Sequence, residues 1–217
     1  MRPAILKQLA RVDPVMRRLI RRHGPCRLDF QKRRPPFHSL VLAIAHQQLH
    51  AAAAEKILGR FRGLFPQRKF PKPGDLAAVT DSQLRACGFS MAKIRAIRDL
   101  AAKTLSGDVP GSRAIGKMDD EEIIQRLTSV RGVGRWTAEM LLIFQLGRED
   151  VLPVDDFGVR NGFGQAYRRG QMPSPSVLRR FGEIWRPYRT TAAWYLWRAA
   201  DQARQEKAQI KKAVKKK

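Results

Sequence analysis

Two neighbouring carboxylates, Asp155 and Asp156, follow Pro153 and are the residues of this chain best suited to acid–base or electrostatic chemistry. Paired carboxylates are typical of glycosidases, in which an acid and a base flank the bond that is broken. Adjacent residues point about 100° apart on a helix, so these two cannot flank one bond from opposite sides. We therefore expect one carboxylate to act on a substrate and the other to cap a helix starting at Phe157. The alternative is that both serve only as caps.

A second candidate site is RGVGRWTAEM, residues 131–140. Acidic residues and an apolar stripe predict one helix over 119–130, and an apolar run predicts the next over 132–146. Gly132 and Gly134 flank Val133 and can adopt dihedrals that other residues resist, so a tight hairpin should join the two helices. The amides of Gly134 and Arg135 would then lie at a helix N-terminus, where phosphate binds without sequence readout. The alternative is a corner whose glycines serve packing alone.

The elements that must position these residues belong to a strongly basic chain. Lys+Arg 43 against Asp+Glu 19 gives a formal charge of +24 over 217 residues. The six lysines of residues 207–217 supply only a quarter of that charge, so the body of the protein is basic as well. Such a body is expected to bind a polyanion, most commonly nucleic acid. An anionic membrane surface is the competing partner, although no lysine-faced amphipathic helix stands alone in the sequence.

The cysteines and apolar runs exclude several classes of protein. Cys26 and Cys87 form neither a CxxC pair nor a Cys/His ligand spacing, so no zinc site or iron–sulfur cluster is expected. Two distant thiols favour a reducing compartment. The N-terminus lacks a signal-peptide core, and LVLAIA and MLLIF are too short to span a bilayer. We expect a soluble intracellular protein, cytoplasmic and nucleoid-associated, or nuclear in a eukaryote.

Helical periodicity runs through nearly the whole sequence. Residues 37–61 predict one long helical stretch, and residues 90–105 predict another. Helix starts are marked by Asp13-Pro14, by Ser174-Pro175 and by a capping box of Thr80 with Gln83. No segment alternates with strand periodicity over more than a few residues. We predict an all-α fold of about eight to ten short helices, followed by a solvated basic tail.

LTSVRGVGRWTAEMLL followed by VLPVDDFGVRNGF resembles the hairpin and the Gly/Pro-rich loop with aspartate of the helix-hairpin-helix DNA glycosylase superfamily (HhH-GPD). Within that superfamily the sequence is similar to the 3-methyladenine DNA glycosylase II group. AIAHQQLHAAAAEKI, DLAAVTDSQLRACGFSMAKIRAIRDLA and WRPYRTTAAWYLWR also match the group in order and spacing. The resemblance covers roughly residues 37–200. It implies a two-lobed all-α fold with the active-site cleft between the lobes.

The domain layout implied by this resemblance is one glycosylase domain over residues 1–205 and a basic tail over 206–217. The lobe with the hairpin would span roughly 37–153, and the second lobe would combine 1–36 with 154–205.

The resemblance also implies roles for individual residues. It places the catalytic aspartate at Asp156, and it places Trp136 and Trp197 in the pocket for an extruded nucleotide, with Met140 where some relatives have an aromatic residue. A cation over an indole face gains roughly 0.5–2 kcal/mol, which favours a cationic alkylated purine over a neutral base. The alternative for Trp197 is core packing, because it lies beside Trp194 in an apolar helix.

Gln47 and Gln48 match the family's DNA-probing loop, in which Gln48 would enter the base stack. A base inside a duplex must be extruded before chemistry, and the gap must be filled. The alternative is two polar residues on an exposed helix face, and the flanking His46 and His50 fit that alternative better than a catalytic role.

No cofactor is expected for the chemistry, although the resemblance implies a structural cation at the hairpin. This ion, monovalent or other, would bridge hairpin and phosphate and would be bound by the backbone carbonyls of Thr128, Val130 and Val133.

The position just after the hairpin separates the subclasses of the family. Bifunctional members carry a lysine there, whose amine forms a Schiff base with the sugar, whereas this chain has Trp136. We therefore expect a monofunctional hydrolase of alkylated purines that acts on damaged double-stranded DNA as a monomer and leaves an abasic site. The alternatives are a non-catalytic duplex-binding protein and a glycosylase for an oxidised or deaminated base.

Overall fold

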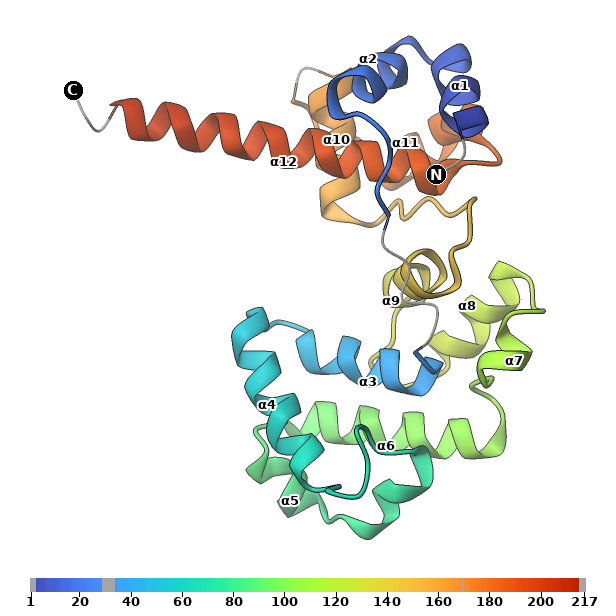
Figure 1. Ribbon diagram of the computed structural model, residues 1–217, viewed down its shortest axis with the longest axis vertical. Coiled ribbons are helices and arrows are strands. Elements are labelled where there is room, and N and C mark those ends of the chain that lie inside the picture. The colour runs from blue at the N-terminus through green and yellow to red at the C-terminus, as the bar shows by residue number, and fades with distance from the viewer. Residues whose placement is uncertain (1–2, 29–33, 169, 215–217) are drawn as a thin grey trace. The chain divides into compact units, whose positions relative to one another are not determined.

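The computed structural model describes residues 3–28, 34–168 and 170–214, with the side chains of 211–214 left aside. Within these ranges the chain forms twelve α-helices with short 3-10 and π segments and no strand, which confirms the all-α prediction (Figure 1). The chain divides into two compact units, one of residues 1–30 and 147–217 and the other of residues 31–146. None of the described helices combines the length and apolarity needed to cross a bilayer.

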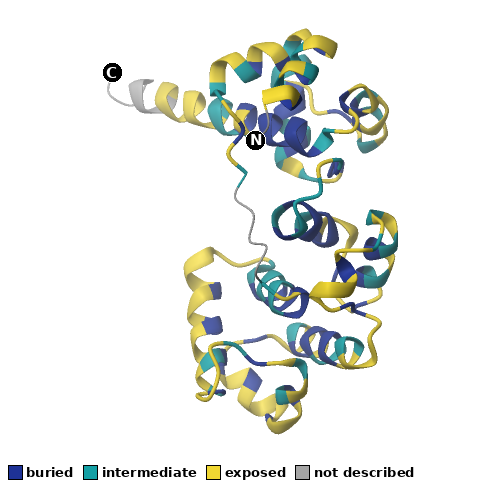
Figure 2. Ribbon diagram, turned by 45° about the vertical axis from the view of Figure 1, so that its right-hand side comes forward, coloured by how far each residue is buried: buried dark blue, intermediate teal, exposed yellow. Residues whose placement is uncertain are grey.

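The unit boundaries differ from the expected lobes. They fall after residue 30 and after residue 146, rather than near 36 and 153. Gly147 follows a π-helical turn and has φ +67°, a dihedral that ends a helix and that glycine adopts without strain. The first part of the expected basic tail belongs to α12 (Arg189–Val214), which is exposed from Arg204 to Ile210 (Figure 2).

The first unit is built around the crossing of α10 and α12. Its described elements are α1 (Pro3–Val12), α2 (Pro14–His23), α10 (Phe157–Tyr167), α11 (Pro175–Phe181), the 3-10 turn Gly182–Trp185 and α12. A Cβ at Gly162 of α10 would lie 1.8 Å from the carbonyl oxygen of Leu196 in α12. Only glycine therefore permits this close approach of the two helices.

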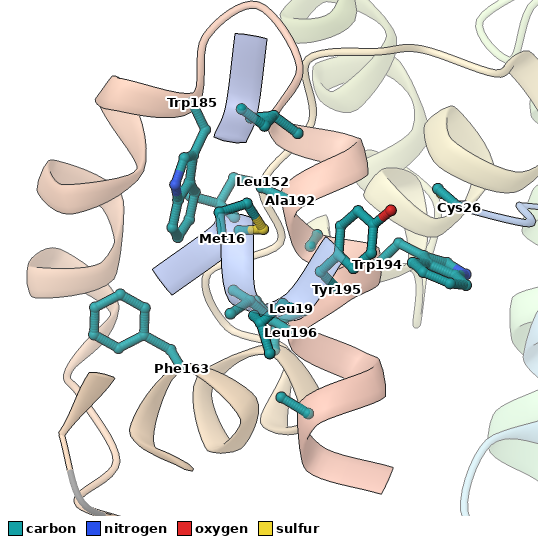
Figure 3. Packing of buried hydrophobic residues seen from close by; sticks show 14 of the residues in the cluster. Met16, Leu19, Cys26, Leu152, Phe163, Trp185, Ala192, Trp194, Tyr195 and Leu196 are labelled. Atoms are coloured by element: carbon teal, nitrogen blue, oxygen red, sulfur yellow. The ribbon is translucent and has the colours of Figure 1, made fainter. Parts of the chain in front are cut away.

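The core of this unit packs buried side chains such as Met16, Phe163 and Trp185 together (Figure 3). A buried carboxylate, that of Asp13, contacts this core. Asp13, 2% exposed, caps α2 through the amides of Val15 and Met16, as the Asp-Pro signature predicts. Its other oxygen accepts the indole N–H of Trp185 at 2.8 Å and the hydroxyl of Tyr167 at 2.5 Å. Burial of that hydroxyl beside the carboxylate raises the pKa of Tyr167. These bonds satisfy a charge whose burial would otherwise be costly.

The second unit packs its helices around α3 and α6. Its described elements are α3 (Pro36–His46), α4 (Ala51–Gly63), the 3-10 turn Pro73–Ala78, α5 (Asp81–Ala86), α6 (Met91–Ser106), α7 (Ser112–Ile115), α8 (Asp120–Thr128), α9 (Arg135–Leu141) and a π segment (Leu142–Leu146). The apolar face of α6 is buried, as is that of α3. The Thr80–Gln83 capping box is confirmed at the start of α5.

The predicted long helix over 37–61 is wrong, because α3 and α4 are separate helices joined through residues 47–50. Gln48 has φ +57°, a value rare outside glycine. Lys93 of α6 donates to the carbonyls of Ala45 (2.8 Å) and Gln47 (2.9 Å) and so holds the end of α3. A tertiary contact thus overrides the helical pattern of the segment.

The predicted helix over 132–146 is also shorter than expected. It begins at Arg135 and remains α-helical only to Leu141, after which residues 142–146 form the π segment. A π segment inserts a residue into the helical repeat and often lies at a functional site.

Candidate functional site

Asp156 is the N-cap of α10 and holds its carboxylate in a fixed orientation. Its Oδ1 accepts the amide of Val159 at 2.7 Å and the indole Nε1–H of Trp197 at 2.8 Å. The helix N-terminus adds a favourable field for the ionised carboxylate. The side chain is half-buried, so solvent or a ligand can still approach it.

The expected division of roles between the two carboxylates is wrong. Asp155 is exposed, and the side chain that caps α10 is that of Asp156, the same residue that the resemblance makes catalytic. The cap must immediately precede the first helical residue, Phe157, and only position 156 does so. The capping role therefore cannot be used to separate the two acids.

Trp197 reaches Asp156 because two glycines of α10 make room for α12. Gly162 permits the close crossing, and a Cβ at Gly158 would lie 2.8 Å from the indole Cδ1 of Trp197. Trp197 is half-buried, and its indole N–H donates a hydrogen bond to the carboxylate of Asp156. Trp197 therefore positions Asp156 in addition to packing between the helices. Gly158 and Gly162 were not predicted as site residues, although their spacing of four residues places them on one helix face.

The glycine hairpin has the geometry expected from the sequence. Gly132 has φ +75°, and Gly134 is the N-cap of α9 with no atom within 4 Å of the place a Cβ would take. The Asp99 carboxylate of α6 accepts the amide of Arg131 at 2.7 Å, and Lys103 contacts the carbonyl of Ser129. The hairpin backbone is therefore held in place by α6, with open space before the first turn of α9.

The side chain of Arg135 contacts acidic residues of the protein itself. Its two terminal nitrogens donate to both carboxylate oxygens of Glu121 at 2.9 Å, and its Nε lies 3.1 Å from Glu139, which is 4% exposed. The hydrogen bond from Arg135 lowers the pKa of Glu121, and the same pair raises the pKa of Arg135. The guanidinium thus ties α8 to α9.

The two glutamines lie in a loop that contacts the hairpin. Gln47 Nε2 donates to the carbonyl of Gly132 at 2.8 Å, and Gln48 is exposed at the apex with its positive φ. Lys93, which was not predicted as a site residue, holds this loop through the carbonyl of Gln47, and burial lowers the pKa of its ammonium group. No local signal could reveal Lys93, because its partners are 46 and 48 residues away.

Trp136 and Met140 lie four residues apart on α9 and so share one face. Trp136 is 46% exposed, unusual for an indole, and Met140 is half-buried. The indole of Trp136 is therefore partly exposed to solvent on the first turn after the hairpin.

The carbonyls of Thr128, Val130 and Val133 remain a predicted cation site. They lie at the end of α8 and in the hairpin, and the Val130 carbonyl accepts the amide of Val133 at 3.0 Å. Carbonyl oxygens suit a hard cation, and a carbonyl engaged in one hydrogen bond retains a second lone pair. Across the described residues no group of three His, Cys, Asp or Glu side chains could hold a metal instead.

The Asp156 carboxylate and the glycine hairpin occur together in a known superfamily of proteins. Residues 41–187 match the family model of the HhH-GPD superfamily base excision DNA repair proteins. The chain belongs to this superfamily.

Individual relatives narrow the class. The chain is 39% identical over 193 residues to DNA-3-methyladenine glycosylase 1 of Schizosaccharomyces pombe, covering 88% of this chain and 85% of the relative. Its fold matches the solved structure of the S. pombe 3-methyladenine DNA glycosylase in complex with abasic DNA, with a TM-score of 0.79, 38% identity and coverage of 89% and 95%. The DNA-3-methyladenine glycosidase structure from Bacillus halodurans gives a TM-score of 0.86 at 35% identity, with coverage of 94% and 92%. Within the superfamily, the chain fits the 3-methyladenine DNA glycosylase group.

Proposed function

We propose that this chain is a monofunctional DNA glycosylase that removes alkylated purines, such as 3-methyladenine and 7-methylguanine, from double-stranded DNA in base excision repair. The observation that carries the proposal is the oriented, half-buried carboxylate of Asp156, in a chain 38% identical to a glycosylase solved with abasic DNA. The basic charge of +24 and the open helix end at Gly134 supply the affinity for the DNA backbone.

The chemistry needs only one carboxylate. In the reaction, the bond between C1′ and the purine nitrogen breaks, and its electron pair leaves with the purine. An alkylated purine is cationic beforehand and departs neutral, so no strong general acid is required. Positive charge grows on the sugar, where a fixed carboxylate stabilises it electrostatically. A water oxygen then bonds to C1′, and Asp156 accepts or directs the proton that the water releases.

Trp136 in place of a lysine after the hairpin supports hydrolysis without a covalent intermediate. We propose that Trp136, Trp197 and Met140 contact the extruded base, while Gln48 fills the gap in the duplex and Gln47 fixes the loop. Borohydride should therefore trap no enzyme–DNA adduct during base release, since no Schiff base forms.

The deciding experiment incubates the protein with randomly methylated DNA and identifies the freed bases by chromatography. Release of methylated purines, with abasic sites left in the DNA, supports the proposal. Tight duplex binding with no base release from methylated, oxidised or deaminated DNA would instead identify a non-catalytic binding protein, in which Asp156 serves only as the helix cap. Release of oxidised or deaminated bases alone would assign the other lesion class.

Binding should depend strongly on salt, with a slope of log K against log salt near −0.9 for each phosphate neutralised. We also propose that a monovalent cation on the Thr128, Val130 and Val133 carbonyls strengthens binding at the hairpin. Replacing K⁺ by tetramethylammonium at constant ionic strength should then weaken DNA binding. Because DNA is the substrate, we place the protein with the chromosome, in the cytoplasm of a bacterium or the nucleus of a eukaryote, and expect it to act as a monomer.

A further inference from the structure

The unit of residues 31–146 contains a cavity of about 520 Å³ beside α3 and α9. This volume lies within the range of about 300–1,000 Å³ found for small-molecule sites. Its apolar lining includes Leu40 from α3 and Met140, Leu141 and Phe144 from α9 and the π segment. A methionine sulfur packs well against a flat aromatic ring, so this wall suits a planar heterocycle.

A pair of titratable side chains belongs to the lining of the cavity. His46, the last residue of α3, and Glu55, on α4, both line it, with Nε2 of His46 3.4 Å from Oε1 of Glu55. The other carboxylate oxygen, Oε2, lies 3.6 Å from Arg62. The side chains of His46 and Glu55 are 38% and 55% exposed, so a ligand can reach both. The pair gives the cavity a negative group next to an apolar wall.

The lining also includes the cationic residue Arg34. Arg34 precedes α3, whereas His46 ends it, and α3 is eleven residues long, or about 15 Å. Of the two oppositely charged side chains in the lining, Glu55 is therefore the one that lies beside His46. A ligand near His46 therefore lies beside the Glu55 carboxylate, whose negative charge is partly balanced by Arg62 at 3.6 Å.

We propose that this cavity receives the alkylated base, and that Glu55, oriented by His46, selects purines that carry a positive charge. The inference rests on the proposed function and specifies how that site recognises its substrate class. Against the Met140 wall a neutral and a cationic purine pack alike, because their rings have the same shape. Only the cationic ring gains from a carboxylate at the edge of the cavity. Glu55 is thus a specificity-determining residue, and His46 is a positioning residue.

A charge series at position 55 tests the inference. Wild type, Glu55→Gln and Glu55→Lys are compared in single-turnover release of 7-methylguanine at saturating enzyme, and DNA affinity is measured alongside. We expect release to fall about threefold to tenfold with glutamine and further with lysine, while DNA affinity stays constant or rises with the added positive charge. Release of neutral hypoxanthine, where wild type shows it, should change less than twofold. Glu206 provides the matched control, since it is 56% exposed and lies 3.3 Å from Arg22, and Glu206→Gln and Glu206→Lys should leave release unchanged.

His46→Gln tests the orienting role, and His46→Gln/Glu55→Gln tests whether the two residues act together. If His46 acts through Glu55, the double variant should release 7-methylguanine no more slowly than Glu55→Gln alone. A release rate that does not follow the charge at position 55 overturns the inference and leaves the proposed function intact. If wild type itself releases no methylated base, the proposed function fails and this inference fails with it.

Discussion

The indole Nε1–H of Trp197 donates to Oδ1 of Asp156 at 2.8 Å, and the same oxygen accepts the amide of Val159 at 2.7 Å. One carboxylate oxygen thus links α10 to α12. This arrangement makes Asp156 a structural residue and a candidate catalytic residue at once, so tests of its role must separate folding from chemistry.

Asp156→Asn should reduce base release by about a hundredfold to a thousandfold, the effect typical of removing one electrostatic stabiliser. Asparagine is also a good N-cap and keeps an oxygen for Val159 and Trp197, so the melting temperature should change little. Single-turnover base release, DNA affinity and thermal unfolding measured together check this. Asp155→Asn, at the exposed neighbour, is the control and should remain active. Full activity of Asp156→Asn would remove this carboxylate from the mechanism.

Trp197→Phe should slow base release about tenfold, because the ring remains but the donor to Asp156 is lost and the carboxylate is less well oriented. DNA affinity should be unchanged, because binding of the duplex backbone does not depend on the hydrogen bond between Trp197 and Asp156. Trp194→Phe is the control, as Trp194 is buried beside Tyr195 in the same helix. Equal losses of activity in the two variants would indicate that Trp197 only packs.

Gly134→Glu should weaken DNA binding on every sequence by placing a carboxylate before the first turn of α9. The protein should still fold, because no atom lies within 4 Å of the new Cβ. Gly111 is the N-cap of α7 with the same open surroundings and extended backbone, so Gly111→Glu matches the change in charge. Fluorescence anisotropy with two unrelated duplexes compares them, and equal weakening by both variants would count against a phosphate site at the hairpin.

Gly162→Ala should destabilise the first unit by about 1–3 kcal/mol or prevent its folding, since its Cβ would meet the Leu196 carbonyl at 1.8 Å. Gly59→Ala is the control, because no atom lies within 4 Å of the place that the new Cβ would take. This substitution should stabilise α4 by about 0.5–1 kcal/mol. Urea unfolding of the two variants measures both effects. Tolerance of alanine at position 162 would mean that α10 and α12 do not cross this closely.

His38 should make stability depend on pH. Burial, with Arg34 and Arg62 nearby, lowers the pKa of His38 from 6.5 to about 4, and its ring stacks on Phe70. Between these two pH values the unfolded chain binds a proton at His38 and the folded protein does not. The contribution of His38 to the free energy of unfolding is therefore complete above pH 6.5 and falls as the pH drops towards 4. In His38→Gln, the urea midpoint of unfolding should change less between pH 6.5 and pH 4 than it does in wild type. An unchanged slope would assign the effect to other groups.

The helical class, the capping boxes and the glycine hairpin could be predicted because each depends on neighbours a few residues apart. Asp13-Pro14, Thr80 with Gln83 and the Gly132–Gly134 turn all have the local geometry that their residue types favour. The positive charge is likewise a property of composition, and it identified the class of partner.

Tertiary contacts decided the features that these local patterns missed. The break between α3 and α4 depends on Lys93, whose partners are more than forty residues away in the sequence. The identity of the capping carboxylate depended on where α10 begins, and the role of Trp197 depended on how closely α12 crosses α10. His46 and Glu55 became a candidate specificity pair only when α3 and α4 brought them to one cavity. Hydrogen bonds and close packing between distant segments leave no periodic signal in a single sequence, whereas propensity and charge do.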